Sequence, residues 1–185
     1  CYSVITVSLH NLYSEEFIMN EKSQSFKKVC GRIHAASVIF LAVEILFGVI
    51  YLLGLTGIDT MWTGNIWETI PEFIRTATML LMFNYVRLIF GQLRKSETPF
   101  LPEVPRRLKA IAYTLIIGGG AYWTAGFAVL GALQYFAAIP TSVGIDTVAA
   151  TVFGVLFMMF GCVIWGISYI FARGCELQQE SDETL

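Results

Sequence analysis

Apolar residues gather in four blocks along the chain, at 33–55, 73–90, 111–133 and 148–171. A bilayer core needs about 20 residues of helix, and the second block reaches that length only with its flanks. None of the blocks alternates between apolar and polar positions as half-buried strands do. Because the bilayer core holds no water, each block must satisfy its backbone groups as a helix. The pattern predicts an all-α integral membrane protein, a four-helix transmembrane bundle forming one domain over residues 19–185.

Composition supports a membrane protein and excludes several other classes. Hydrophobic residues make up 56% and charged residues only 14%, against about 25% charged residues in globular proteins. The mean hydropathy is +0.65. A net charge of −2 gives no basic surface for direct nucleic-acid binding. The four cysteines are scattered, so neither a metal site nor a disulfide framework is predicted. No HExxH, GxSxG, P-loop or cofactor motif occurs, which favours a non-enzymatic protein.

The basic residues indicate the orientation of the spans. The connections 56–72 and 134–147 contain no Lys or Arg. Ten of the 12 basic residues lie in the other polar segments: Lys22, Lys27, Lys28, Arg32, Arg94, Lys95, Arg106, Arg107, Lys109 and Arg173. By the positive-inside rule those segments face the cytoplasm. We therefore expect a multi-pass protein with both termini cytoplasmic, an inner loop at 91–110 and a tail at 172–185.

The segment 1–18 differs from the rest of the chain. It contains no Met, and Met19-Asn20-Glu21-Lys22 after it looks like a natural start. The segment has no basic n-region and no uninterrupted apolar core, so it is a poor signal peptide. Its mild alternation fits a short strand or no order. We expect residues 1–18 to be a non-native or disordered extension without a function.

A candidate polar cluster lies within the membrane blocks. Glu44 is at the midpoint of the first block, where a charged residue costs about 2.5–3.5 kcal/mol on insertion scales. Asn84 and Arg87 share nearly one face of the second block, and Arg87 is long enough to approach the midplane. We predict a cluster of Glu44, Asn84 and Arg87. Glu44 is either a proton- or ligand-sensing carboxylate or a polar pin that fixes helix packing, and the absence of a second acidic residue from the blocks favours the pin.

The connection 56–72 carries Asp59, Glu68 and Glu72, which we expect to be solvated in an exposed loop. Arg75, at the start of the next block, can extend its charge to water along its apolar stem. We therefore expect Arg75 to serve as an interface anchor.

Small residues recur in the last two blocks. Gly154, Gly161 and Ser168 are spaced by seven, and a GGG triplet occupies 118–120. In lipid, small residues let helices approach closely. The pattern favours close helix packing or local bending over a phosphate-binding loop, because such a loop requires a strand-to-helix turn.

The inner loop and the tail form the candidate docking surface. Pro99, Pro102 and Pro105 favour an extended entry, and a helix can begin near Glu103. The mixture of apolar and basic residues suits either an interfacial anchor or a docking site. The acidic tail can continue the fourth helix, either to form weak screened pairs or to receive a basic partner. The predicted docking residues are Pro99, Phe100, Arg106, Arg107, Lys109, Gly174, Leu177, Gln178, Glu180 and Asp182.

Two cytoplasmic segments, RLIFGQLRKSETPFLPEVPRRLKAIA at 87–112 and IFARGCELQQESDETL at 170–185, carry a family resemblance. They resemble a bacterial domain-of-unknown-function family of small four-pass membrane proteins with a GxxLQxExDxTL-type tail. The resemblance covers residues 19–185. It implies a bacterial cytoplasmic membrane protein whose gene often neighbours that of a helix-turn-helix regulator related to the lambda repressor.

These observations predict a non-enzymatic regulatory or sensory membrane protein. Its inner loop and acidic tail would bind a cytoplasmic helix-turn-helix regulator, because such a regulator presents a basic DNA-facing surface. The alternative is a small transporter, permease accessory subunit or immunity-type resistance protein that uses the mid-membrane polar cluster. The expected surroundings are the lipid bilayer, and the sequence is also compatible with a homo-oligomer.

Overall fold

The computed structural model describes the backbone of residues 2–56, 66–96, 101–130 and 142–183. Side chains are described for residues 23–54, 56, 69–96, 101–127, 148, 151–181 and 183. All regular structure in these ranges is helical: α1 (Tyr2–Leu55), α2 (Ile66–Leu93), α3 (Glu103–Thr124), the π-helix η1 (Ala125–Leu130) and α5 (Ser142–Glu183). The predicted all-α fold is confirmed.

Three of the described helices are long and apolar enough to cross a membrane, over Ser23–Gly54, Thr69–Leu93 and Thr151–Ser181. They overlap the first, second and fourth predicted blocks. The third block begins inside α3 and continues through η1. The first two turns of α3 contain Arg106, Arg107 and Lys109, which lower the mean hydropathy of the helix. A fourth crossing therefore stays a prediction.

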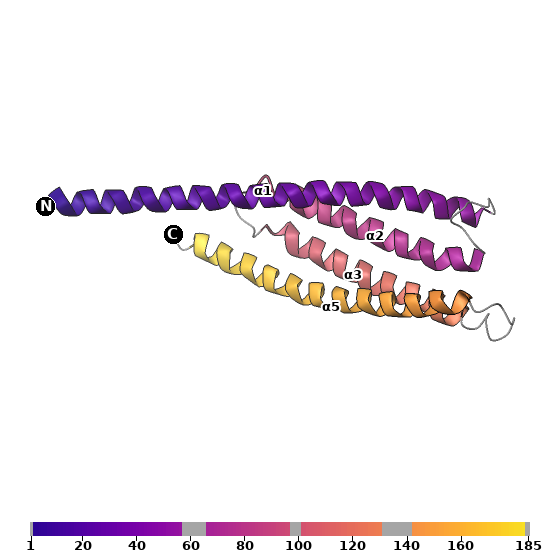
Figure 1. Ribbon diagram of the computed structural model, residues 1–185. Helices are drawn as coiled ribbons and strands as arrows, with labels where there is room; N and C mark the ends of the chain where they lie inside the picture. The colour runs from indigo at the N-terminus through magenta and orange to yellow at the C-terminus, as the bar shows by residue number, and fades with distance from the viewer. Residues whose placement is uncertain (1, 57–65, 97–100, 131–141, 184–185) are drawn as a thin grey trace.

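The helices pack in a row, in chain order (Figure 1). α1 packs on α2, α2 on α3, and α3 on α5, while α2 touches α5 only slightly and α1 contacts no other described element than α2. A closed four-helix bundle would give each helix two principal neighbours, so the expected bundle is not confirmed. The outward faces of the row carry exposed apolar side chains such as Ile39, Ile117 and Ile170, as lipid contact requires.

Residues 2–18 belong to α1, which is continuous from Tyr2 to Leu55. The expectation of a short strand there is wrong, because the backbone is helical. A helix forms because its hydrogen bonds are local and need no partner strand. That the segment is a non-native or disordered extension stays a prediction.

The α3–α5 pair is held by very close backbone approach. A methyl group on Gly119 would lie 2.8 Å from the carbonyl oxygen of Gly154, and one on Gly161 would lie 2.9 Å from the carbonyl oxygen of Ala112. Ser168, farther along the same stripe, is fully buried. The prediction that this small-residue stripe packs against a neighbouring helix is confirmed.

The α1–α2 pair is antiparallel. The rings of Phe40 and Phe83 stack with centroids 5.1 Å apart. Toward one end, the imidazole Nδ1 of His34 lies 3.0 Å from the carbonyl oxygen of Arg87; a carbonyl only accepts, so Nδ1 donates. A buried apolar cluster runs from this end toward the middle of the helices and comprises Cys30, Ile89, Leu93, Val104, Ile111, Leu115 and Phe157.

Candidate functional site

The tail and the inner loop lie against each other, as the predicted docking surface requires. α3 begins at Glu103 and α5 continues to Glu183, which confirms the expected helix start and the helical tail. Between them lies an open pocket of about 520 Å³, here called the loop–tail pocket. It is lined by Pro102, Pro105, Ala172, Cys175, Glu176, Gln178, Gln179 and Glu183. Glu176 and Glu183 are the only charged residues in this lining, so the pocket is acidic.

Hydrogen bonds arrange the polar side chains of the loop–tail pocket. Arg173 donates to Glu176 at 2.8 Å, and Gln179 donates to Glu183 at 3.1 Å. The amide oxygen of Gln178 is buried and has no hydrogen-bond partner among the described residues. An unpaired buried acceptor is unfavourable, so a donor from a bound partner that reached this oxygen would be stabilising.

The predicted docking residues differ in where the structure places them. Gln178 lines the loop–tail pocket, whereas Glu180, Leu177 and Arg106 are exposed outside its lining. Gly174 is half-buried on α5, also outside the lining. Pro99, Phe100 and the side chain of Asp182 lie outside the described residues.

The other two predicted basic residues have partners within the protein. Arg107 donates to Glu103 at 3.1 Å, one turn earlier on α3. The Lys109 ammonium lies 4.9 Å from the ring centroid of Tyr169 on α5, a distance at which a cation–π interaction is favourable. Lys109 therefore contributes to α3–α5 packing.

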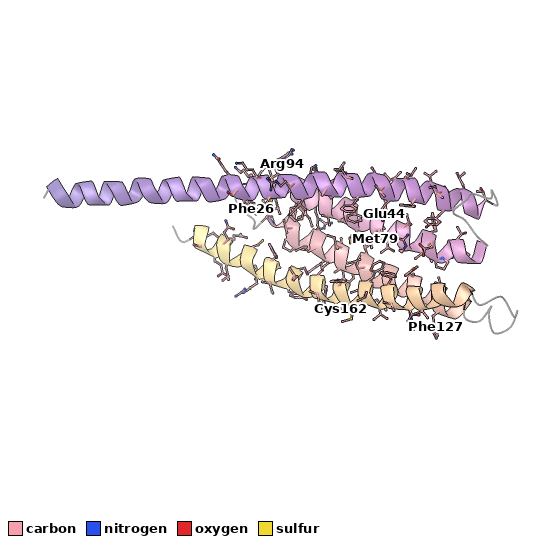
Figure 2. The ribbon with its side chains drawn as sticks, viewed as in Figure 1. Phe26, Glu44, Met79, Arg94, Phe127 and Cys162 are labelled. Atoms are coloured by element: carbon pink, nitrogen blue, oxygen red, sulfur yellow. The ribbon has the colours of Figure 1, made fainter. Side chains whose placement is uncertain are left out.

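In the predicted membrane cluster, the structure brings two of the three residues together. Arg87 donates to the amide oxygen of Asn84 at 3.3 Å. Glu44, on the stretch of α1 that runs alongside α2 (Figure 2), makes no described hydrogen bond to either of them. One of its carboxylate oxygens is buried and has no hydrogen-bond partner among the described residues. The charged side chains that act on Glu44 are Arg75, which attracts it, and Glu72, which repels it.

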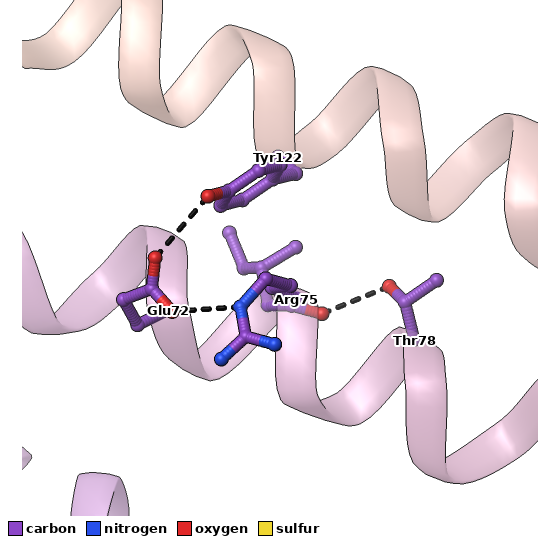
Figure 3. Close-up of polar contacts among 5 residues, drawn as sticks. Glu72, Arg75, Thr78 and Tyr122 are labelled. Carbon is purple, nitrogen blue, oxygen red and sulfur yellow. Dashed lines mark hydrogen bonds and ion pairs between the residues drawn. The ribbon is translucent and has the colours of Figure 1, made fainter. Parts of the chain in front are cut away.

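Sequence reasoning missed the cluster formed by Glu72, Arg75 and Tyr122, here called the Glu72 cluster. The Glu72 carboxylate accepts from the Arg75 guanidinium at 2.7 Å and from the Tyr122 hydroxyl at 3.1 Å (Figure 3). Glu72 is half-buried within α2, so the expected solvated loop position is wrong. Arg75 was expected to extend its charge alone to the membrane interface, whereas the structure pairs it with Glu72. The i,i+3 spacing of Glu72 and Arg75 was the available signal.

The described residues contain no group of three or more His, Cys, Asp or Glu side chains able to hold a metal ion. No protein-family model, curated protein or solved structure matches the chain.

Proposed function

We propose that this protein is a non-enzymatic regulatory protein of the bacterial cytoplasmic membrane that docks a cytoplasmic partner in the loop–tail pocket. One observation carries the proposal: segments far apart in sequence, at 102–105 and 172–183, together line an acidic pocket. The proposed topology has four spans, arranged as a bundle, with both termini cytoplasmic. The ten basic residues outside the spans support that topology through the positive-inside rule.

The partner's expected chemistry follows from the lining. Two carboxylates and the unpaired Gln178 oxygen suit Lys or Arg side chains, which supply only donors. A volume of about 520 Å³ accommodates a few side chains rather than a whole domain. A helix-turn-helix regulator carries a basic DNA-facing surface, and docking would occupy that surface and keep the regulator from DNA.

Charge-neutral variants test the docking proposal. The full chain, and its Glu176→Gln/Glu183→Gln variant, would be purified in one detergent from native cells, and bound proteins identified by mass spectrometry. A captured regulator would then be purified and its affinity measured. We expect the double variant to weaken binding about tenfold, since two interface charges are lost. Glu180→Gln is the matched control, because Glu180 lies on α5 outside the pocket lining. Equal binding by the wild-type protein and the double variant would refute docking in this pocket.

A small transporter is the second candidate, and the Glu72 cluster favours it. Ionisable residues within membrane spans often mark substrate or proton pathways, and Glu72 and Arg75 lie within the apolar stretch Thr69–Leu93. Transport predicts that Glu72→Gln or Glu44→Gln abolishes substrate or proton flux in reconstituted vesicles, while Glu176→Gln/Glu183→Gln leaves flux intact. Docking predicts the reverse pattern for regulator binding.

A further inference from the structure

A second pocket, of about 330 Å³, lies where α1 and α2 meet near the predicted cytoplasmic side. We call it the basic pocket. Its lining contains four cationic side chains and one imidazole, together with Leu88, Gly91 and Gln92; the five basic groups are His34, Arg87, Arg94, Lys95 and Arg107. No Asp or Glu belongs to this lining. Three helical segments thus bring positive charge to one opening. Glu103 lies behind its wall, where it accepts from Gln92 at 2.6 Å and pairs with Arg107, so the other three cationic side chains carry the net charge of the pocket.

Two guanidinium groups in the basic pocket retain unused donors. Arg87 donates from Nη2 to Asn84, and Arg107 donates from Nη2 to Glu103. The Nε of Arg87 and the Nη1 of Arg107 are nevertheless buried and have no acceptor among the described residues. Buried donors without an acceptor are unfavourable. Both guanidinium groups line the pocket, so a side-chain rotation that turned these donors toward a bound anion with several oxygen atoms would satisfy them.

The close approach of α1 and α2 shapes the basic pocket. A Cβ at Gly91 would lie 3.3 Å from the His34 ring, so the absence of a side chain leaves space for the imidazole. The aliphatic stem of Arg94 passes the backbone of Gly31 on α1, 3.6 Å from where a Cβ would be. Figure 2 shows Arg94 beside α1. This contact places the Arg94 side chain against α1, where Arg94 lines the basic pocket.

We propose that the basic pocket binds the phosphate group of an anionic ligand. Guanidinium groups present planar pairs of donors that match phosphate oxygens. Arg94 and Lys95 have no ion-pair partner among the described residues, so their charge is available to the ligand. A phosphate would accept from the guanidinium groups of Arg87 and Arg107, which line the pocket, while the exposed Arg94 and Lys95 neutralise its charge.

The position of the basic pocket along the helices suggests the source of the phosphate. Arg87 lies inside the apolar stretch Thr69–Leu93, whereas Arg94 and Lys95 directly follow it. The pocket therefore lies where a membrane span meets the headgroup layer, and basic pockets between membrane helices at this depth bind anionic headgroups. Leu88 in its lining is exposed and offers an apolar contact to an acyl chain. Inorganic phosphate shares the same recognition chemistry.

The test uses the full chain, delipidated in a neutral detergent. Binding of phosphatidylglycerol, of phosphatidylcholine and of inorganic phosphate would be measured separately by native mass spectrometry. Each surface cation contributes about fivefold to attraction of an anionic lipid, so Arg94→Gln/Lys95→Gln should weaken phosphatidylglycerol binding about 25-fold. The control Arg106→Gln/Arg173→Gln removes the same charge from exposed positions outside the lining and should change binding less than about fivefold.

The binding measurements distinguish a lipid phosphate from a soluble one. Phosphatidylglycerol binding that depends on Arg94 and Lys95 identifies a lipid phosphate as the ligand, and phosphate binding with the same dependence identifies a soluble one. Charge-conserving Arg94→Lys/Lys95→Arg should retain at least half of the wild-type affinity, which separates lost charge from misfolding. Equal losses in the pocket and control variants, or no binding of either anion by the wild-type protein, would overturn the proposal.

Discussion

Gly119 on α3 and Gly154 on α5 face each other so closely that a methyl group on either would meet the other's carbonyl oxygen. The distances from the added carbon to that oxygen would be 2.8 Å at Gly119 and 2.9 Å at Gly154. Backbone atoms cannot rotate away as a side chain can, so a larger residue must push the helices apart. The pair therefore sets the spacing between α3 and α5.

Gly154→Ala is expected to destabilise the protein by about 1–3 kcal/mol, the usual cost of overpacking. Gly166→Ala is the matched control on the same helix, because a Cβ there meets nothing within 4 Å. The control should be neutral, or stabilising by up to about 1 kcal/mol through its better helix propensity. Unfolding in detergent by sodium dodecyl sulfate titration would measure both, and equal effects would contradict the assigned contact.

The Tyr122–Glu72 hydrogen bond joins α3 to α2, and Tyr122→Phe removes only its donor. We expect a loss of about 1.5–3 kcal/mol, the range for hydrogen bonds to charged groups. The ring contact with Phe157, at 6.4 Å between centroids, should remain. Tyr113→Phe on the same helix is the control, since Tyr113 is exposed. A double-mutant cycle with Glu72→Ala, which removes the acceptor, should give a coupling energy of similar size, and a coupling near zero would argue against the bond.

Glu44→Gln tests the two interpretations of the mid-span carboxylate. One Glu44 oxygen is buried without a hydrogen-bond partner among the described residues, so replacing the carboxylate by a neutral amide removes an unfavourable buried charge. We expect the free energy of unfolding to stay the same or to rise by up to about 1 kcal/mol. A polar pin would instead be weakened by the substitution. Thermal unfolding in detergent distinguishes the two outcomes, and a clear loss of stability would restore the pin interpretation.

The predicted topology can be checked with native cysteines. Cys30 is buried, whereas Cys175 is partly exposed at the loop–tail pocket. In a Cys1→Ser/Cys162→Ser background, a water-soluble maleimide should label Cys175 in inverted membrane vesicles but not in intact cells. Cys30 should react only after denaturation, which provides an internal control. Labelling of Cys175 from outside the cell would reverse the proposed orientation.

The Glu72 cluster shows where sequence reasoning stopped. By hydropathy the second block begins at Phe73, so Glu72 is expected in the preceding loop. Helix α2 instead begins at Ile66, and Pro71 lies in its second turn. Pro71 has no N–H, so α2 continues through it without the helical hydrogen bond to the carbonyl of Trp67. The contact with Tyr122, 50 residues away, was beyond any local pattern.

By itself, the sequence determined the features that depend on residues close together along the chain. The apolar blocks specified helices. The spacing of small residues specified a close-packing face on α5, and the tail sequence allowed α5 to continue to Glu183. The tertiary structure decided the order of the helices in the row and placed Arg87 and Arg107 in the lining of one pocket. It also left Glu44 without a described hydrogen bond to Arg87. Helical hydrogen bonds span four residues, whereas those relationships depend on which helices become neighbours.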